Sequence, residues 1–141
     1  MESSLRKVLS LLKKKSKNDV EAGKYFERLV KIFLENDDIQ SDEYSKVWHY
    51  SDWAKENTDY SSIDIGIDLV AKLKDKEGYC AIQCKFYNPD RSISKMDIDS
   101  FISASSPSLF KRLMLVDTSR KPLSKNAQSV FDNLESEYIR I

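Results

Sequence analysis

The sequence predicts an α/β fold in which a mixed central β-sheet is flanked by helices. Three observations support this prediction: apolar residues recur at helical spacing, alternating residues flank a polar turn, and a short continuous apolar run follows later in the chain. Helical and strand patterns alternate after the first two helices, which is typical of layered α/β architectures. We therefore expect one sheet with helices on its faces.

Apolar stripes at three- and four-residue spacing predict the helices. They cover residues 5–15, 18–35, 92–104 and 123–134. The second helix has two candidate caps, Asn18 and Asp19, whose side-chain oxygens can accept hydrogen bonds from the N–H groups of a first turn. The third helix is expected to bury its apolar residues, which are Met96, Ile98, Phe101 and Ile102.

Alternating and continuous apolar runs predict the strands. Residues 66–71 and 81–85 form a β-hairpin with Gly78 in its turn, and residues 113–116 form a strand covered on both faces. Residues 138–141 begin a further strand. Because the chain stops inside that strand, we expect it to be the N-terminal fragment of a larger multidomain protein.

The stretch 36–62 gives a weaker pattern, because polar and aromatic residues are mixed without a clear period. We expect a loop-rich connection that contains one short strand or helix. Trp48 and Trp53 in this stretch either anchor it to the core or stack on nucleic-acid bases. His49 is the only histidine, so a zinc site built from histidine and cysteine cannot form within this chain.

With 141 residues, the chain suits a single domain over residues 1–141, in which residues 1–16 are an N-terminal helical extension. No apolar run approaches the ~18 residues of a membrane span, and no signal-peptide pattern is present, so we expect a cytoplasmic protein without membrane contact. Cys80 and Cys84 lie four residues apart in one predicted strand. Their Cα atoms are therefore ~13 Å apart, beyond the ~7 Å reach of a disulfide, and both should be reduced thiols.

The formal net charge of zero restricts how the chain can bind nucleic acid. Proteins that bind DNA tightly on their own usually carry a basic excess, because neutralised phosphates supply most of the non-specific affinity. We therefore do not expect tight DNA binding by this chain alone. A catalytic module that other domains hold on DNA is compatible with this charge.

The predicted hairpin presents a candidate catalytic site. Asp68 lies on the first strand, and Gln83 and Lys85 project from one face of the second, because strand residues two apart share a face. The backbone carbonyl of Cys84 lies between them, and Glu27 on helix 18–35 is placed to reach the edge of the sheet. Carboxylate and carbonyl oxygens hold divalent cations such as Mg²⁺, and an ammonium stabilises phosphoryl oxygens. These residue types indicate a nuclease, although they are also common on solvated strand faces.

Residues 66–71 and 81–87 resemble the Mrr-like branch of the PD-(D/E)xK nuclease superfamily, in its D…QxK variant. Residues 23–27 resemble the opening helix of that family, and residues 92–101 resemble the helix that follows its catalytic strand. More narrowly, residues 48–141 are similar to the N-terminal nuclease domains of Type ISP restriction-modification enzymes and related helicase-linked proteins.

The resemblance implies a restriction-endonuclease-like core and the activity of a metal-dependent DNA endonuclease. Such a domain hydrolyses phosphodiester bonds of double-stranded DNA in a restriction-modification system, with Mg²⁺ or Mn²⁺ as cofactor. The implied catalytic residues are Asp68, Gln83, Lys85 and Glu27. The implied metal ligands are Asp68, Gln83, Glu27 and the backbone of Cys84.

The resemblance also implies partners and neighbours of the site. Downstream helicase or ATPase, methyltransferase and target-recognition domains would direct cleavage, and a transient dimer would form on DNA. Asp64 matches an acid often found in the turn of this family, where it neighbours the site or only solvates the turn. The expected phosphate contacts, which have a plain surface role as their alternative, are Lys24, Arg91, Ser94 and Lys95.

Two alternative functions stay open at the level of sequence. A nuclease-fold module that has lost cleavage, and that only binds DNA or a partner, is favoured by Gln83, which stands where an acid is more usual. A junction-resolvase-type nuclease is the other alternative, and it would require an obligate dimer.

Overall fold

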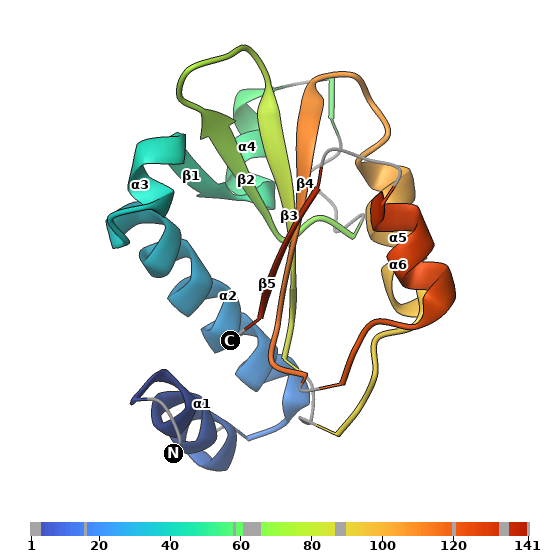
Figure 1. Cartoon of the computed structure of the whole chain (residues 1–141). Helices are drawn as coiled ribbons and strands as arrows, with labels where there is room; N and C mark the ends of the chain where they lie inside the picture. Colours follow the sequence, from blue (N-terminus) through green and yellow to red (C-terminus); the bar gives the residue numbers. More distant parts are fainter. Residues whose placement is uncertain are drawn as a thin grey trace.

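A five-stranded mixed sheet forms the centre of the molecule, with its strands in the spatial order β1-β2-β3-β4-β5 (Figure 1). The computed structural model describes residues 4–15, 17–57, 59–60, 66–86, 90–119, 121–132 and 136–140. The strands are β1 (Tyr44–His49), β2 (Leu69–Leu73), β3 (Tyr79–Lys85), β4 (Phe110–Asp117) and β5 (Ser136–Arg140). The pairs β1–β2 and β2–β3 are antiparallel, and the pairs β3–β4 and β4–β5 are parallel. The predicted mixed α/β sheet is therefore confirmed.

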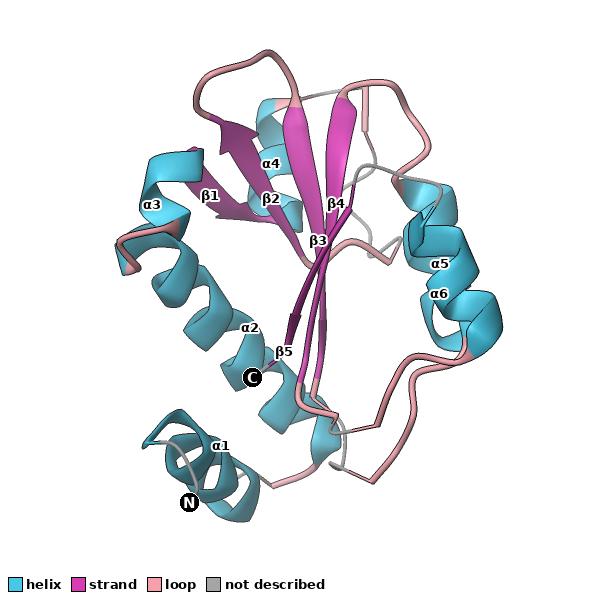
Figure 2. Cartoon of the chain, viewed as in Figure 1, coloured by secondary structure: helices cyan, strands magenta, loops and turns pink. Residues whose placement is uncertain are grey.

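Helices flank this sheet on both faces (Figure 2). They are α1 (Ser4–Lys15), α2 (Asp19–Asn36), α3 (Gln40–Glu43), α4 (Tyr50–Glu56), α5 (Lys95–Ala104) and α6 (Lys125–Asp132). All helices predicted from apolar stripes are present, and Asn18 caps α2, because its Oδ1 accepts a hydrogen bond from the N–H of Glu21 at 2.9 Å. The predicted end of the last helix, residues 133–134, lies outside the described residues. No described helix is long and apolar enough to cross a membrane.

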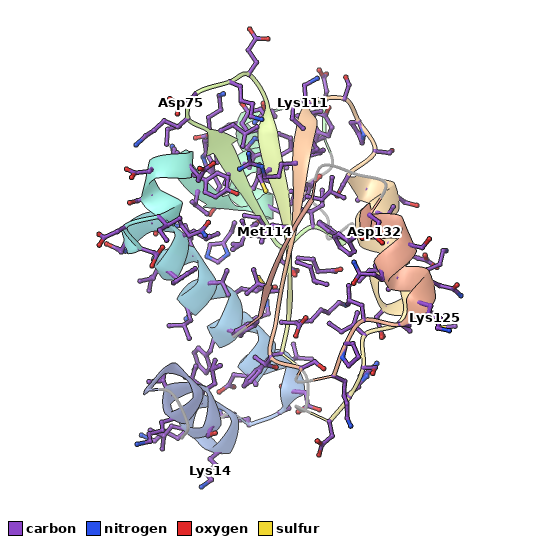
Figure 3. The ribbon with its side chains drawn as sticks, in the orientation of Figure 1. Lys14, Asp75, Lys111, Met114, Lys125 and Asp132 are labelled. Carbon is purple, nitrogen blue, oxygen red and sulfur yellow. The ribbon has the colours of Figure 1, made fainter. Side chains whose placement is uncertain are left out.

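Two apolar cores, one on each face of the sheet, hold the layers together. On the α2 side, Phe26, Val30 and Leu34 are fully buried against strand residues that include Met114, which Figure 3 labels at the centre of the sheet. On the other side, α4, α5 and α6 contribute a core that contains Trp53. Burying an apolar side chain of this size contributes about 1.5–3 kcal/mol, so these cores determine which strand residues face which layer.

The side chains of β3 alternate between the two cores, as the period of a strand requires. Cys80 belongs to the α2-side core and Ala81 to the opposite core. The same alternation places Gln83 and Lys85 on the face opposite α2, as the sequence predicted. Cys80 and Cys84 are both free thiols, which confirms the prediction that they form no disulfide.

The predicted turn between β2 and β3 is confirmed at Gly78, which has a φ of 102°. A Cβ at this position would collide with the side chain of Lys111 and lie 3.0 Å from the carbonyl oxygen of Leu109. Glycine is therefore required here by both backbone conformation and close packing.

The stretch from residue 36 to residue 56 is more regular than the predicted loop-rich connection, because α3, β1 and α4 follow one another there. β1 pairs with β2, and Trp48 lies opposite Val70. Trp53 has no exposed surface, and its ring centroid lies 5.4 Å from that of Tyr79 and 5.5 Å from that of Phe110. Of the two alternatives, anchoring is confirmed for Trp53 and base stacking by Trp53 is wrong, whereas Trp48 is partly buried against the same core. The sequence predicted one short strand or helix here but did not locate it, because pairing with β2, rather than a local pattern, stabilises β1.

The prediction that Met96 belongs to the core is wrong. Met96 is 85 % exposed, whereas Ile98 and Phe101 are fully buried. Because α5 turns by about 100° per residue, Met96 lies roughly 200° around the helix from Ile98 and so faces solvent.

The turn before β2 depends on Gly66, which has a φ of 102°. A Cβ at Gly66 would lie 2.9 Å from the carbonyl carbon of Ser100 and 3.0 Å from the nitrogen of Phe101, so the turn packs directly against the backbone of α5. Contacts at these distances leave no room for a side chain.

Gly66→Ala is expected to lower the free energy of unfolding by at least about 1–3 kcal/mol, because a strained backbone is added to a collision with α5. Urea denaturation followed by circular dichroism measures this change. Gly23→Ala is the matched control, since a Cβ at Gly23 meets no described part of the chain within 4 Å. Equal unfolding midpoints for Gly66→Ala and the unmodified chain would contradict the prediction.

Candidate functional site

Asp68 directly precedes β2 and is held by three hydrogen bonds at the edge of β3. Its N–H donates to the carbonyl of Ile82 at 2.9 Å, and its carbonyl accepts from the N–H of Tyr50 at 3.0 Å. Its carboxylate Oδ2 accepts from the N–H of Cys84 at 2.7 Å. The carboxylate is therefore fixed beside the last residues of β3, where the sequence placed the candidate site. β2 itself begins one residue later, at Leu69.

Gln83 is buried, with 6 % of its surface exposed, and its two amide atoms have different surroundings. Nε2 donates a hydrogen bond to the carbonyl of Gly66 at 3.1 Å, which fixes the orientation of the amide. Oε1 is buried and accepts no hydrogen bond from the described residues. An unpaired buried acceptor costs about 1–3 kcal/mol, so this oxygen is a candidate ligand atom for a cation.

The backbone of Cys84 faces Asp68. Since the N–H and the carbonyl of a strand residue point toward the same neighbouring strand, the hydrogen bond from this N–H to Asp68 places the Cys84 carbonyl on the same side. The Cys84 side chain packs against the α2-side core. Burial raises the pKa of its thiol well above the usual value, and the carboxylates of Asp68 and Glu27 raise it further, so the thiol stays protonated at neutral pH.

Glu27 and Asp68 share an open pocket of about 420 Å³ between α2 and the start of α4. One wall follows a single face of the first turns of α2, and the other wall comes from the β1–α4 junction and the turn before β2. The lining residues are Asp19, Val20, Gly23, Lys24, Glu27, His49, Tyr50, Ser51, Ile67 and Asp68. The structure therefore brings the predicted carboxylates together, with the predicted phosphate contact Lys24 at the same pocket.

Lys85 ends β3 and is half-buried. Its carbonyl accepts a hydrogen bond from the N–H of Thr118 at 3.2 Å, and its Cα pairs in register with that of Asp117 on β4. Paired residues of parallel strands point to the same face, so the fully buried Asp117 neighbours Lys85. Asp117 was not predicted from the sequence, although an acid directly after the apolar run 113–116 is the signal that could have identified it.

The set of candidate ligands is mixed. Among the residues that the structure describes, no group of three or more histidine, cysteine, aspartate or glutamate residues is arranged to hold a metal ion. A cation bound by all the predicted ligands would combine the carboxylates of Asp68 and Glu27, which line the pocket, with the amide oxygen of Gln83 and the carbonyl of Cys84, which are not among the residues that line it. Such an all-oxygen set fits hard cations such as Mg²⁺. Asp64 lies outside the described residues.

The other predicted DNA contacts gather at the start of α5, where each has a partner within the chain. Arg91 forms an ion pair with Asp97 at 2.9 Å, and Lys95 forms one with Asp99 at 2.8 Å. Ser94 is the N-cap of α5 and forms a reciprocal capping box with Asp97. The hydroxyl of Ser94 therefore stabilises the helix, and both basic side chains are exposed at its first turn.

His49 also lines the pocket but was not predicted as a site residue. It ends β1 and is half-buried beneath α2. Burial lowers the pKa of its imidazole below 6.5, the positive charges of Lys31 and Arg28 lower it further, and Asp52 and Glu35 oppose the shift. The pocket therefore holds a neutral imidazole at neutral pH.

Comparisons with known proteins show which family and which solved structures this chain is similar to. The model of a restriction endonuclease family, Mrr_cat_2, matches residues 35–141. A solved structure of the ATP-dependent Type ISP restriction-modification enzyme LlaBIII bound to DNA is similar, with a TM-score of 0.72 and 28 % identity over 94 % of this chain. This chain spans only 8 % of the length of that enzyme. The MspJI restriction endonuclease in complex with a 27-mer oligonucleotide matches with a TM-score of 0.41 and 13 % identity, over 99 % of this chain and 32 % of that one. No curated protein matches by sequence.

Because His49 is the only histidine, its pKa can be measured directly by an NMR titration of the folded chain, and a value below 6.5 is expected. The unfolded chain then binds this proton at a higher pH than the folded chain does. The neutral His49 therefore contributes to the free energy of unfolding. This contribution is fully present above pH 6.5 and is lost as the pH falls through the pKa of His49 in the folded chain.

His49→Gln supplies the control for this titration, because it keeps a polar side chain but removes the titrating group. The unfolding free energy of this variant should depend less on pH between roughly 7.5 and 5.5 than that of the unmodified chain. A measured imidazole pKa at or above 6.5 would contradict the account of its surroundings.

Proposed function

Because the chain belongs to the Mrr_cat_2 family of restriction endonucleases, we propose that it is a metal-dependent endonuclease domain that cleaves double-stranded DNA in a restriction-modification system. One observation carries the proposal: the carboxylate of Asp68 and the unpaired amide oxygen of Gln83 lie at the same end of β3, next to Lys85. The family match includes these three residues, whereas Glu27 lies before it.

The proposed cofactor is Mg²⁺, with Mn²⁺ as a substitute. Asp68, Glu27, Gln83 Oε1 and the Cys84 carbonyl would hold it. A divalent cation at this position supplies charge neutralisation and lowers the pKa of a coordinated water. Only two of these four ligands carry a negative charge, so the affinity for the cation should be modest.

The residues of the chain would orient the reacting groups. Asp68 is already fixed by its hydrogen bonds, so its carboxylate needs little rearrangement to act. Lys85 would place its ammonium beside the phosphoryl oxygens and stabilise the charge that develops on them. The buried Asp117, in register with Lys85, would orient that ammonium. The protonated thiol of Cys84 takes no part.

The proposed substrate and partners follow from the same site. Lys24 contacts phosphate at the pocket, and Arg91 and Lys95 exchange their carboxylate partners for DNA phosphates. The chain would act as one domain of a longer cytoplasmic protein, in which helicase or ATPase, methyltransferase and target-recognition domains position it. The small share of LlaBIII that this chain spans supports that arrangement. Cleavage of both strands would use a transient dimer on DNA.

A second candidate function is a nuclease-fold module that binds DNA without cleaving it. The neutral Gln83 at a ligand position is the observation that favours this alternative, because it removes one negative charge from the cation site. A junction-resolvase-type nuclease has no observation of its own in its favour.

Supercoiled plasmid should be nicked by the chain in Mg²⁺ or Mn²⁺, and EDTA should abolish nicking. Asp68→Asn and Lys85→Ala should each lower the rate at least about 10²-fold, because each removes charge at the reacting phosphate. Asn is the informative change at Asp68, since its oxygen can still accept the hydrogen bond from Cys84 and the fold is preserved.

The matched controls for this assay are Asp52→Asn and Lys111→Ala, which change exposed residues of the same types outside the proposed ligand set. Both controls should nick at the rate of the unmodified chain. Nicking that survives in Asp68→Asn would show that the site is wrong. Absence of nicking together with retained DNA binding would favour the inactive module.

Gln83→Glu tests the cation site through stability. Without metal, the variant should lose about 1–3 kcal/mol of unfolding free energy, because the carbonyl of Gly66 loses its donor and a second negative charge lies near Asp68. Millimolar Mg²⁺ should then stabilise the variant more than it stabilises the unmodified chain, since the added carboxylate raises cation affinity.

Gln40→Glu is the control for this measurement, because Gln40 is also a buried glutamine whose Oε1 has no hydrogen-bond partner among the described residues. It should be destabilised without any gain from Mg²⁺. An equal effect of Mg²⁺ on both variants would exclude Gln83 from the cation site.

A further inference from the structure

Gly23 lies inside the regular helix α2, and nothing in the fold requires a glycine at this position. It lies in the second turn of α2, and it does not have the positive φ that Gly66 and Gly78 have. A Cβ at this position would meet no described part of the chain within 4 Å. Neither backbone conformation nor packing therefore requires a glycine here, in contrast to the other two glycines of the chain.

A glycine in a helix interior destabilises the helix relative to alanine, because the unfolded backbone has more freedom to lose. The absence of a side chain at Gly23 therefore weakens α2 without any compensation from the rest of the described chain. Gly23 lies on the pocket wall between Val20 and Glu27, where the absent side chain leaves helix backbone exposed to the pocket. A ligand that approached this exposed backbone closely would compensate for the weaker helix.

The surroundings of Gly23 indicate what kind of ligand would approach. Lys24 is exposed and lines the same pocket, and one turn earlier Val20 is 69 % exposed. A positively charged side chain next to an apolar surface suits the sugar-phosphate backbone of DNA, whose phosphates are charged and whose deoxyriboses are largely apolar. The exposed Asp19 also lines the pocket, and the acidic pair Glu27 and Asp68 belongs to the proposed metal site.

Charge is distributed unevenly along this chain of zero net charge. Basic residues outnumber acidic ones before residue 32, with Arg6, Lys7, Lys13, Lys14, Lys15, Lys17, Lys24, Arg28 and Lys31 against Glu2, Asp19, Glu21 and Glu27. Lys14, Lys15 and Lys17 are exposed where α1 leads into α2, and Lys14 projects away from the ribbon in Figure 3. These lysines precede the pocket in sequence, and the last of them lies only a few residues before Asp19, the first residue that lines the pocket.

We propose that one strand of duplex DNA crosses the first turns of α2, with its sugar-phosphate backbone against Gly23 and its phosphates bound by Lys24, Lys14, Lys15 and Lys17. This inference rests on the proposed nuclease function and adds the path by which the substrate strand reaches Asp68. The path runs over the α1–α2 junction. This path does not include the start of α5, where Arg91 and Lys95 would contact other phosphates of the duplex after exchanging their carboxylate partners.

The test compares stability with DNA binding for two variants of the 141-residue chain, Gly23→Ala and Gly23→Gln. Binding to a fluorescein-labelled duplex is measured by anisotropy at low salt in EDTA, where no cleavage occurs. Gly23→Gln should weaken binding on the order of tenfold, because its side chain fills the space that the strand needs. Both variants should raise the melting temperature by about 3 °C, because α2 gains a better helix former.

Lysine variants provide the second arm of the test. Combined substitution Lys14→Ser and Lys17→Ser should weaken binding and reduce its dependence on salt concentration, since fewer phosphates are neutralised. The matched control is Lys111→Ser, which removes an exposed lysine that Figure 3 labels at the opposite end of the molecule from Lys14. It should leave the salt dependence unchanged.

The outcomes separate this inference from the proposed function. Unchanged DNA binding by Gly23→Gln overturns the inference, even if the unmodified chain nicks plasmid and the nuclease function stands. Weakened binding by this stabilised variant supports the strand path, even if the unmodified chain shows no nicking. No measurable binding of duplex DNA by the unmodified chain at low salt would also overturn the inference.

Discussion

The hydrogen bond from the Cys84 N–H to the carboxylate of Asp68, 2.7 Å long, is the interaction on which the candidate site depends. It joins the turn before β2 to the end of β3 at a point where the regular ladder between these strands has stopped. The main chain of Asp68 is bound on both sides as well, to Ile82 and to Tyr50. A carboxylate is thereby oriented by the sheet itself, which is the kind of preorganisation that catalysis of phosphoryl transfer requires.

The same turn connects the site to both apolar layers. Gly66 packs against the backbone of α5 and accepts the hydrogen bond that orients Gln83, so the face opposite α2 positions one candidate ligand. α2 contributes Glu27 to the pocket from the other face. Asp68 lines the pocket together with Glu27, and its carboxylate accepts a hydrogen bond from the N–H of Cys84, the residue that follows Gln83. The site is therefore assembled at the end of β3 from residues of both faces of the sheet. Substitutions in α2 and substitutions in the turn before β2 can change its two sides separately.

Local patterns in the sequence were sufficient for the elements that carry the site. The period of two along β3 placed Gln83 and Lys85 on one face, and the apolar stripe of α2 left Glu27 at its edge. Features that depend on pairing between distant parts of the chain could not be predicted from the sequence. β1 is a strand because β2 lies beside it, and Asp117 neighbours Lys85 only through the parallel register of β3 and β4. The orientation of the Gln83 amide likewise depends on the packing of a distant helix against a turn.

The central claim is that Asp68 and Gln83, together with Glu27, form one site for a divalent cation. Anomalous diffraction from crystals of the chain soaked in Mn²⁺ tests it most directly, because manganese can be located without reference to activity. The account predicts an anomalous peak in contact with the Asp68 carboxylate and with Oε1 of Gln83. A peak bound by other residues, or no peak at a Mn²⁺ concentration that supports nicking, would contradict it.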